Sequence, residues 1–146
     1  MKSNKGFTLI ELLAVIVILA IIALIATPTI LSVIETARKG SAKSSALGFV
    51  DTVEKQVAID LLESDADNKI LEYPEGKVAV KKGKSLEMKG NMPTSYTLKY
   101  NKTKGTIDGD SCIVVKVDAK WYKVTYAADG TASVADGSTT AVECAA

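Results

Sequence analysis

The sequence predicts an α+β fold, in which the second half of one long N-terminal helix packs on a small antiparallel sheet. Residues 12–34 carry no charge, and apolar residues then recur at helical spacing up to about residue 62. In the last third of the chain apolar and polar residues alternate, as they do in half-buried strands. A chain of 146 residues is long enough for one domain with a modest core.

The uncharged segment is long enough to cross a bilayer. Every residue from 12 to 26 is Leu, Ile, Val or Ala, and a membrane-spanning helix needs about 20 apolar residues. Lys2 and Lys5 precede the segment, and the next positive charge is Arg38. The positive-inside rule therefore predicts a cytoplasmic N-terminus and an exported C-terminal part.

Glu11 lies near the front of this segment, where a carboxylate is costly and needs a partner. A glutamate that snorkels to the lipid headgroups is the simpler alternative. For the segment as a whole, the simpler interpretations are a cleavable secretory signal and a plain uncleaved anchor. Its length and the position of Glu11 count against the secretory signal.

Residues 5–11 read Lys-Gly-Phe-Thr-Leu-Ile-Glu and precede a hydrophobic helix. Together they resemble the class III signal of type IV pilins and pseudopilins, over about residues 1–35. The resemblance implies that a prepilin peptidase cuts between Gly6 and Phe7 and then methylates the new amine of Phe7. It also implies that Glu11 is an assembly residue, which meets the Phe7 amine of a neighbouring subunit and sets the axial register.

The physical chemistry of the motif agrees with this resemblance. Cleavage after Gly6 would create a positive amine on Phe7, and Glu11 lies four residues further on, about one helical turn away. An ion pair within one subunit or across two would neutralise a carboxylate that is otherwise isolated.

Pro28 predicts a break in the helix, because proline lacks the amide hydrogen that would bond to the carbonyl of Leu24. Many type IV pilins place a helix-interrupting proline at the corresponding point. Thr27 and Thr29 can bond to freed backbone groups. The helix can then resume, with the core-facing stripe Ala46, Val50, Val53, Val57 and Leu61. The predicted organisation is a leader at 1–6, a hydrophobic assembly helix at 7–34 and a globular head at 35–146.

The head is predicted to be rich in β-strands. Strands are expected at residues 78–80, 96–100, 112–117, 121–126 and 131–134. Turns are expected at residues 118–120 and at Asp129-Gly130. Residues 65–68 resemble the start of a calcium-binding EF-hand loop, but the glycine and the terminal glutamate are out of place, so they are expected to end the helix.

Cys112 and Cys144 are the only cysteines, and both lie in the part predicted to be exported. A disulfide between them would contribute about 3–4 kcal/mol in the chain-entropy model and would hold the polar tail at 135–146. Type IV pilins often close their C-terminal region in this way. Two free thiols are the alternative, and two cysteines without a histidine make a metal site a poor interpretation.

Composition argues against several classes of protein. The 18 basic and 17 acidic residues nearly cancel, and there is no histidine. A strong field for nucleic-acid binding is therefore absent, as is the commonest general base and metal ligand. No nucleophile motif is recognisable, so we expect no catalytic residue, no cofactor and no enzyme activity.

The resemblance implies a structural subunit of a type IV pilus, which forms a helical filament with copies of itself for adhesion, motility or DNA uptake. The expected partners are the prepilin peptidase and the pilus assembly machinery. The expected locations are the cytoplasmic membrane, for a single-pass precursor, and then an extracellular filament. The alternatives are a pseudopilin of a type II secretion or competence machine, and a membrane-anchored binding domain that never forms fibres.

Overall fold

The computed structural model describes residues 6–74, 77–101, 104–107, 109, 111–127 and 129–144, so most of the expected leader lies outside the described residues. It contains α1 (Leu9–Leu62), β1 (Leu71–Glu72), β2 (Lys77–Val80), β3 (Pro93–Asn101), β4 (Thr106–Ile107), β5 (Ser111–Val117), β6 (Lys120–Tyr126) and β7 (Ala132–Val134). The chain divides into two compact units, Met1–Thr36 and Ala37–Ala146. One long helix followed by a small antiparallel sheet confirms the predicted α+β class.

The N-terminal unit contains the apolar start of α1, and none of its described residues is buried. Among the described residues, α1 is the one helix long and apolar enough to cross a membrane. Pro28 lies inside α1, so the helix resumes after the proline as expected, and the weakening or kink at Pro28 stays a prediction. The missing amide hydrogen removes one helical hydrogen bond, and the chain is helical on both sides of Pro28. The Thr27 hydroxyl donates to the carbonyl of Ala23, at 2.6 Å.

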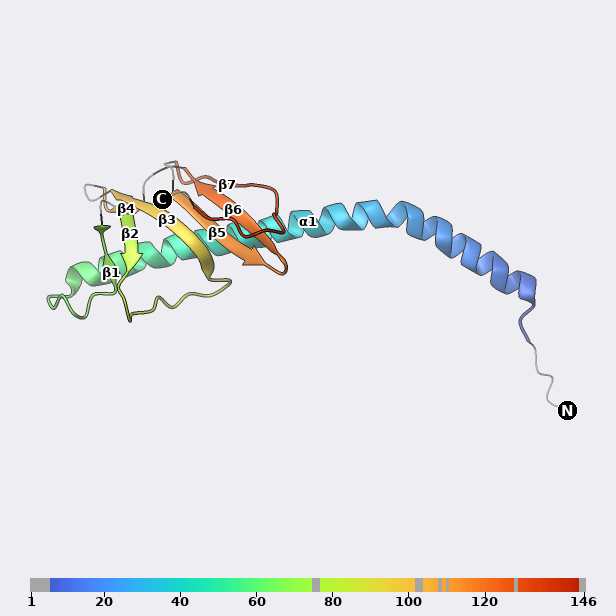
Figure 1. The fold of residues 1–146 in the computed structure, drawn as a ribbon, viewed down its shortest axis with the longest axis horizontal. Coiled ribbons are helices and arrows are strands. Elements are labelled where there is room, and N and C mark those ends of the chain that lie inside the picture. Colours follow the sequence, from blue (N-terminus) through green and yellow to red (C-terminus); the bar gives the residue numbers. More distant parts are fainter. Residues whose placement is uncertain are drawn as a thin grey trace. The chain divides into compact units, whose positions relative to one another are not determined.

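In the second unit the sheet lies across the C-terminal part of α1 (Figure 1). The strand order is β1-β2-β3-β5-β6-β7, β4 pairs with β3, and all these pairings are antiparallel. The β5–β6 hairpin turns through Asp118, whose φ of 53° is unusual for a residue other than glycine. Aspartate tolerates this left-handed conformation better than most residues. The strands predicted from alternation are all present, while β1 and β4, of two residues each, have no counterpart in the prediction.

The core of this unit lies between α1 and the sheet. The helix contributes Ala42, Ala46, Phe49, Val50, Val53 and Val57, which are buried against strand residues such as Leu98, Ile113 and Tyr122. Four of the five predicted stripe positions are therefore buried. The fifth, Leu61, is 73% exposed, because Asp60 faces inward on the last turn instead.

Candidate processing and assembly site

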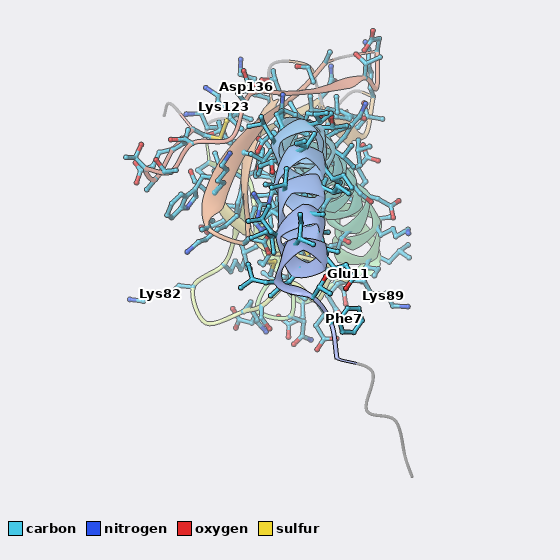
Figure 2. All side chains as sticks on the ribbon, turned by 90° about the vertical axis from the view of Figure 1, so that its right-hand side faces the viewer. Phe7, Glu11, Lys82, Lys89, Lys123 and Asp136 are labelled. Carbon is cyan, nitrogen blue, oxygen red and sulfur yellow. A yellow bond between two sulfur atoms is a disulfide. The ribbon has the colours of Figure 1, made fainter. Side chains whose placement is uncertain are left out.

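The predicted processing and assembly site lies where α1 begins. Gly6, Phe7 and Thr8 are not helical, and Thr8 is the residue immediately before the helix. The Thr8 amide and hydroxyl both donate to Oε2 of Glu11, at 2.8 and 2.7 Å. The amide of Glu11 donates to the Thr8 hydroxyl oxygen, at 3.3 Å. Figure 2 shows the side chains of Phe7 and Glu11 at this end of the helix.

These bonds form a capping box, in which Thr8 and Glu11 satisfy each other's free backbone donors at the helix start. A negative side chain in the first turn also suits the positive end of the helix dipole. The sequence reasoning did not identify Thr8 as a partner of Glu11. The signal was present, since threonine followed three residues later by glutamate before an apolar run is the sequence pattern of a capping box.

The capping box leaves part of the carboxylate available. Both bonds from Thr8 end on Oε2 of Glu11, so Oε1 can accept a bond from outside the helix. Phe7, the residue expected to carry the new amine, is 94% exposed. The aliphatic residues that follow are exposed too, from Leu9 at 83% to Leu24 at 78%.

The other predicted site residues lie in the second unit, where a disulfide joins Cys112 of β5 to Cys144 near the C-terminus, with the two Cα atoms 5.8 Å apart. The amide of Cys144 also donates to the hydroxyl of Ser95 in β3, at 3.3 Å. Side chains two apart on a strand share a face, so Cys112 and Val114 lie together. Val114 is fully buried, yet it is not part of the core against α1. The disulfide therefore anchors the tail on the sheet face opposite α1.

Earlier in the tail, the chain follows the edge of β6. Ser138 and Trp121 exchange backbone hydrogen bonds of 2.9 Å in both directions. Gly137 lies so close to the ring of Tyr122 that a Cβ atom there would be 2.7 Å from it. Position 137 therefore favours glycine, because the buried ring of Tyr122 lies where any other residue would place its Cβ atom.

Two ion pairs hold the β-strands to α1 near the start of the second unit. Arg38, the one arginine in the chain, donates from Nε to Asp118 in the β5–β6 turn, at 3.0 Å. Lys39 donates to Asp136 in the C-terminal tail. The amide of the preceding residue, Ala135, donates to the carbonyl of Lys123 in β6, at 3.0 Å; Figure 2 labels Lys123 and Asp136. The Lys39 ammonium lowers the pKa of Asp136, by its hydrogen bond and its charge.

Asp60 organises the chain after the helix. It is 4% exposed, and its Oδ2 accepts the amides of Ile70 at 3.0 Å and Leu71 at 2.7 Å. Gln56 donates to the other oxygen, at 2.7 Å. A buried carboxylate with three donors is satisfied, and here it fixes the path from α1 into β1. Its role is structural.

The described residues contain no group of three or more His, Cys, Asp or Glu side chains that could hold a metal ion. What the site can do is present an apolar helix and one carboxylate to an external partner.

Residues 1–27 match the family model described as the prokaryotic N-terminal methylation motif. Comparisons of the chain with curated proteins and with solved structures gave no match. The matched residues include the capping box and most of the exposed apolar segment. The chain thus begins with the N-terminal methylation motif, the class III signal that type IV pilins and pseudopilins share.

Proposed function

We propose that this chain is the structural subunit of a type IV pilus. A prepilin peptidase cuts it between Gly6 and Phe7 and methylates the Phe7 amine, and the mature chain polymerises through α1 into a surface filament. The filament serves adhesion, motility or DNA uptake. The observation that carries the proposal is the methylation motif at residues 1–27, placed on a helix whose apolar start has no buried residue.

The exposed apolar surface supports polymerisation. Full burial of one Leu, Ile or Val side chain is worth about 1.5–3 kcal/mol, and residues 12–26 consist of such side chains and alanine. A bilayer supplies an apolar environment for the precursor. A subunit that leaves the bilayer needs an equivalent one, and the same segments of neighbouring copies can supply it.

Glu11 supports an ordered contact between these helices. Its carboxylate would be buried among apolar side chains, where an ion pair must offset the loss of water. Oε2 is used by Thr8, and Oε1 is available to the Phe7 amine of a neighbour. Since such a pair forms at one axial offset between two helices, it would set the register of the filament.

The disulfide favours a pilus subunit over a pseudopilin of a secretion or competence machine. It anchors the C-terminal tail on the sheet, which is how type IV pilins often close this region, whereas secretion pseudopilins often use calcium there.

The test compares Glu11→Gln with Thr8→Val, in cells that make the variant as the sole subunit. Glutamine can still accept the capping bonds from Thr8 but has no charge, while Thr8→Val keeps the charge and removes the hydroxyl. Electron microscopy and mass spectrometry of sheared surface material should show few filaments for Glu11→Gln and near-normal yield for Thr8→Val. Cleavage after Gly6 and methylation of Phe7 should be retained in both.

A normal filament yield from Glu11→Gln would remove the ion pair from the assembly mechanism. An equal loss in both variants would assign the effect to the helix cap alone. If wild-type cells make no fibres that contain this chain, the pilus function is wrong and the membrane-anchored binding domain becomes the better interpretation.

A further inference from the structure

The sheet face opposite α1 carries an excess of positive charge. As the structure bounds them, β2, β3, β5 and β6 contain no Asp or Glu. Their lysines are Lys77, Lys99, Lys116, Lys120 and Lys123. All but Lys120 adjoin a core residue of the same strand, and side chains alternate along a strand, so these four lie on the face opposite α1. Two described acids adjoin this face, Glu72 of β1 and Glu143 beside Cys144. The near balance of charge in the whole chain therefore does not hold here.

At one end of this face, three neighbouring segments place an ammonium group, an indole ring and a hydroxyl group in a row. Lys116 of β5 lies directly opposite Trp121 of β6, and Trp121 is paired with Ser138 of the tail. Side chains of directly paired residues share a face, and paired segments lie about 4.8 Å apart. The row of Lys116, Trp121 and Ser138 is therefore about 10 Å long.

The positive end of the row is not used by an acid of the same chain. Nζ of Lys116 lies 4.6 Å from the centroid of the Trp121 ring, which is a cation–π contact. Lys123 lies on the same face and diagonal to Lys116, with about 7–8 Å between the two backbones. None of the three ion pairs found among the described residues uses either lysine. Both ammonium groups can therefore pair with an anion from outside the chain.

The other end of the row is neutral and polar. The hydroxyl oxygen of Ser138 lies 3.0 Å from that of Thr140, and Thr140 is exposed. A hydroxyl group both donates and accepts hydrogen bonds. A molecule on this row thus meets positive charge at one end, an aromatic surface in the middle and hydroxyl groups at the other end.

We propose that this row, with Lys123 and Thr140 beside it, binds the sugar acids of an acidic polysaccharide. The carboxylate of a uronic acid pairs with the ammonium groups of Lys116 and Lys123. The C–H groups on the face of the sugar ring pack against the electron-rich face of the indole, and the sugar hydroxyls bond to Ser138 and Thr140. The proposal rests on the pilus function and gives its adhesion role a partner, because a filament repeats the site and many weak contacts act together.

The same features fit a nucleic acid poorly. Duplex DNA carries one charge per about 1.7 Å, whereas this face offers four lysines spread over the sheet. Arg38, the one arginine, is paired with Asp118, so no guanidinium is available to read base edges. Single-stranded nucleic acids stack successive bases on several aromatic side chains, and the described residues of this face include one, Trp121. A sugar acid needs only one ring and one or two cations.

The test uses Trp121, the one tryptophan, as a reporter inside the site. The full chain in a neutral detergent is titrated at low salt with trigalacturonate, a uronic acid oligomer, and with its methyl ester, which has no charge. The acid should change the Trp121 emission until it saturates, and the ester should not. Salt at about 1 M, where the Debye length is about 3 Å, should abolish the change. Because the chain is in micelles, the result does not depend on filament formation.

Lysine variants locate the contact. Lys116→Gln and Lys123→Gln should each weaken binding by up to about fivefold, as expected for one exposed ion pair, and the double variant should weaken it more than either. Lys99→Gln is the matched control, because it removes the same charge from the same face. Thr97 is level with Cys112, so Lys99 lies about six residues, or about 20 Å, from Lys116 along the strands. This variant should bind like the wild type.

The outcomes separate the site from the function. No change in Trp121 emission, equal binding of the methyl ester, or equal losses in Lys99→Gln and Lys116→Gln overturn the site. A short DNA duplex that competes more strongly than trigalacturonate at equal charge concentration replaces the polysaccharide by a nucleic acid and overturns the proposal. Filaments of Lys116→Gln with Lys123→Gln should form at normal yield. If the wild-type chain makes no filaments, the pilus function is wrong, while the titration still decides the sugar site.

Discussion

The two parts of α1 present their apolar residues in different ways. Residues 9–36 are almost continuously apolar, and none is buried. Residues 37–62 have an apolar stripe on one side, and six of those residues are in the core of the head. A stripe can be covered by one sheet, but a helix that is apolar all round needs apolar partners on every side. The first part therefore depends on partners outside the chain, and the second on its own sheet.

The largest expected effect on the head comes from Phe49→Ala. Phe49 is 2% exposed, and its ring lies against that of Tyr96 with the centroids 4.8 Å apart. Removal of a buried phenylalanine should lower the free energy of unfolding by about 3–5 kcal/mol. Urea unfolding of the full chain in detergent measures this through Trp121, the one tryptophan, which lies in β6.

Leu19→Ala is the matched control for the first part of the helix. Leu19 is 58% exposed, so the Trp121 transition should not move. A shift as large as that of Phe49→Ala would mean that the two parts of α1 unfold as one unit.

Loss of the disulfide should have the next largest effect. A bond that joins residues 32 apart in the sequence contributes about 3–4 kcal/mol by restricting the unfolded chain. Cys112→Ser with Cys144→Ser should lower the urea midpoint accordingly and increase proteolysis at residues 135–142, because the tail loses its attachment to β5. A tail that stays protected would show that its bonds along β6 are sufficient to hold it.

Replacement of two glycines by alanine should change the stability of the head in opposite directions. In Gly137→Ala the new methyl group would meet the buried ring of Tyr122 at 2.7 Å, and such overpacking should cost about 1–3 kcal/mol. Gly40 lies inside α1, and a methyl group added to it would have no neighbouring atom within 4 Å, so Gly40→Ala should stabilise the head by about 1 kcal/mol. Thermal unfolding followed by circular dichroism should give shifts in opposite directions.

The sequence predicted the long helix and the longer strands because each repeats its own pattern over many residues. The exposed first part of α1 followed from composition alone. The prediction that Leu61 faces the core was wrong. Asp60 and Leu61 lie three and four residues after Val57, so helical spacing allows either to face the core. Asp60 faces inward because its carboxylate accepts hydrogen bonds from the amides of Ile70 and Leu71. These contacts depend on the path of the chain after the helix, which helical spacing does not predict.

The residues of the candidate site also differ in whether the sequence alone could identify them. The motif around Gly6, Phe7 and Glu11 is local in sequence and could be recognised there, and Thr8 could have been recognised from the capping pattern. The pairing of Arg38 with Asp118 could not be predicted from the sequence, because these residues are 80 positions apart. They meet only because the β5–β6 turn packs on the helix. Strands β1 and β4 are two residues long, too short for alternation to indicate them.

The smallest expected effect concerns two exposed aspartates of the head whose pKa values are lowered for different reasons. The Lys39 ammonium lowers the pKa of Asp136, and hydrogen bonds from Thr131 lower that of Asp129. A carboxyl group with a lowered pKa in the folded state stabilises the fold above its unfolded pKa, about 3.9, and this contribution is lost as the pH falls through the folded value. Asp136→Asn and Asp129→Asn should therefore each lower the melting temperature slightly at pH 6, and both differences should shrink as the pH falls below about 3.9 and vanish once the pH is below the folded-state pKa values.

Salt separates the two causes. An exposed ion pair is screened by salt, while a hydrogen bond between a carboxylate and a neutral hydroxyl or amide depends on salt much less. At pH 6, raising the salt concentration to about 1 M, where the Debye length is about 3 Å, should remove most of the effect of Asp136→Asn and little of that of Asp129→Asn. Lys39→Met should reproduce the Asp136→Asn result, and the double variant should add nothing further. If both aspartate effects persist in salt, Asp136 is held by something other than the Lys39 charge, and the ion pair does not fasten the tail to α1.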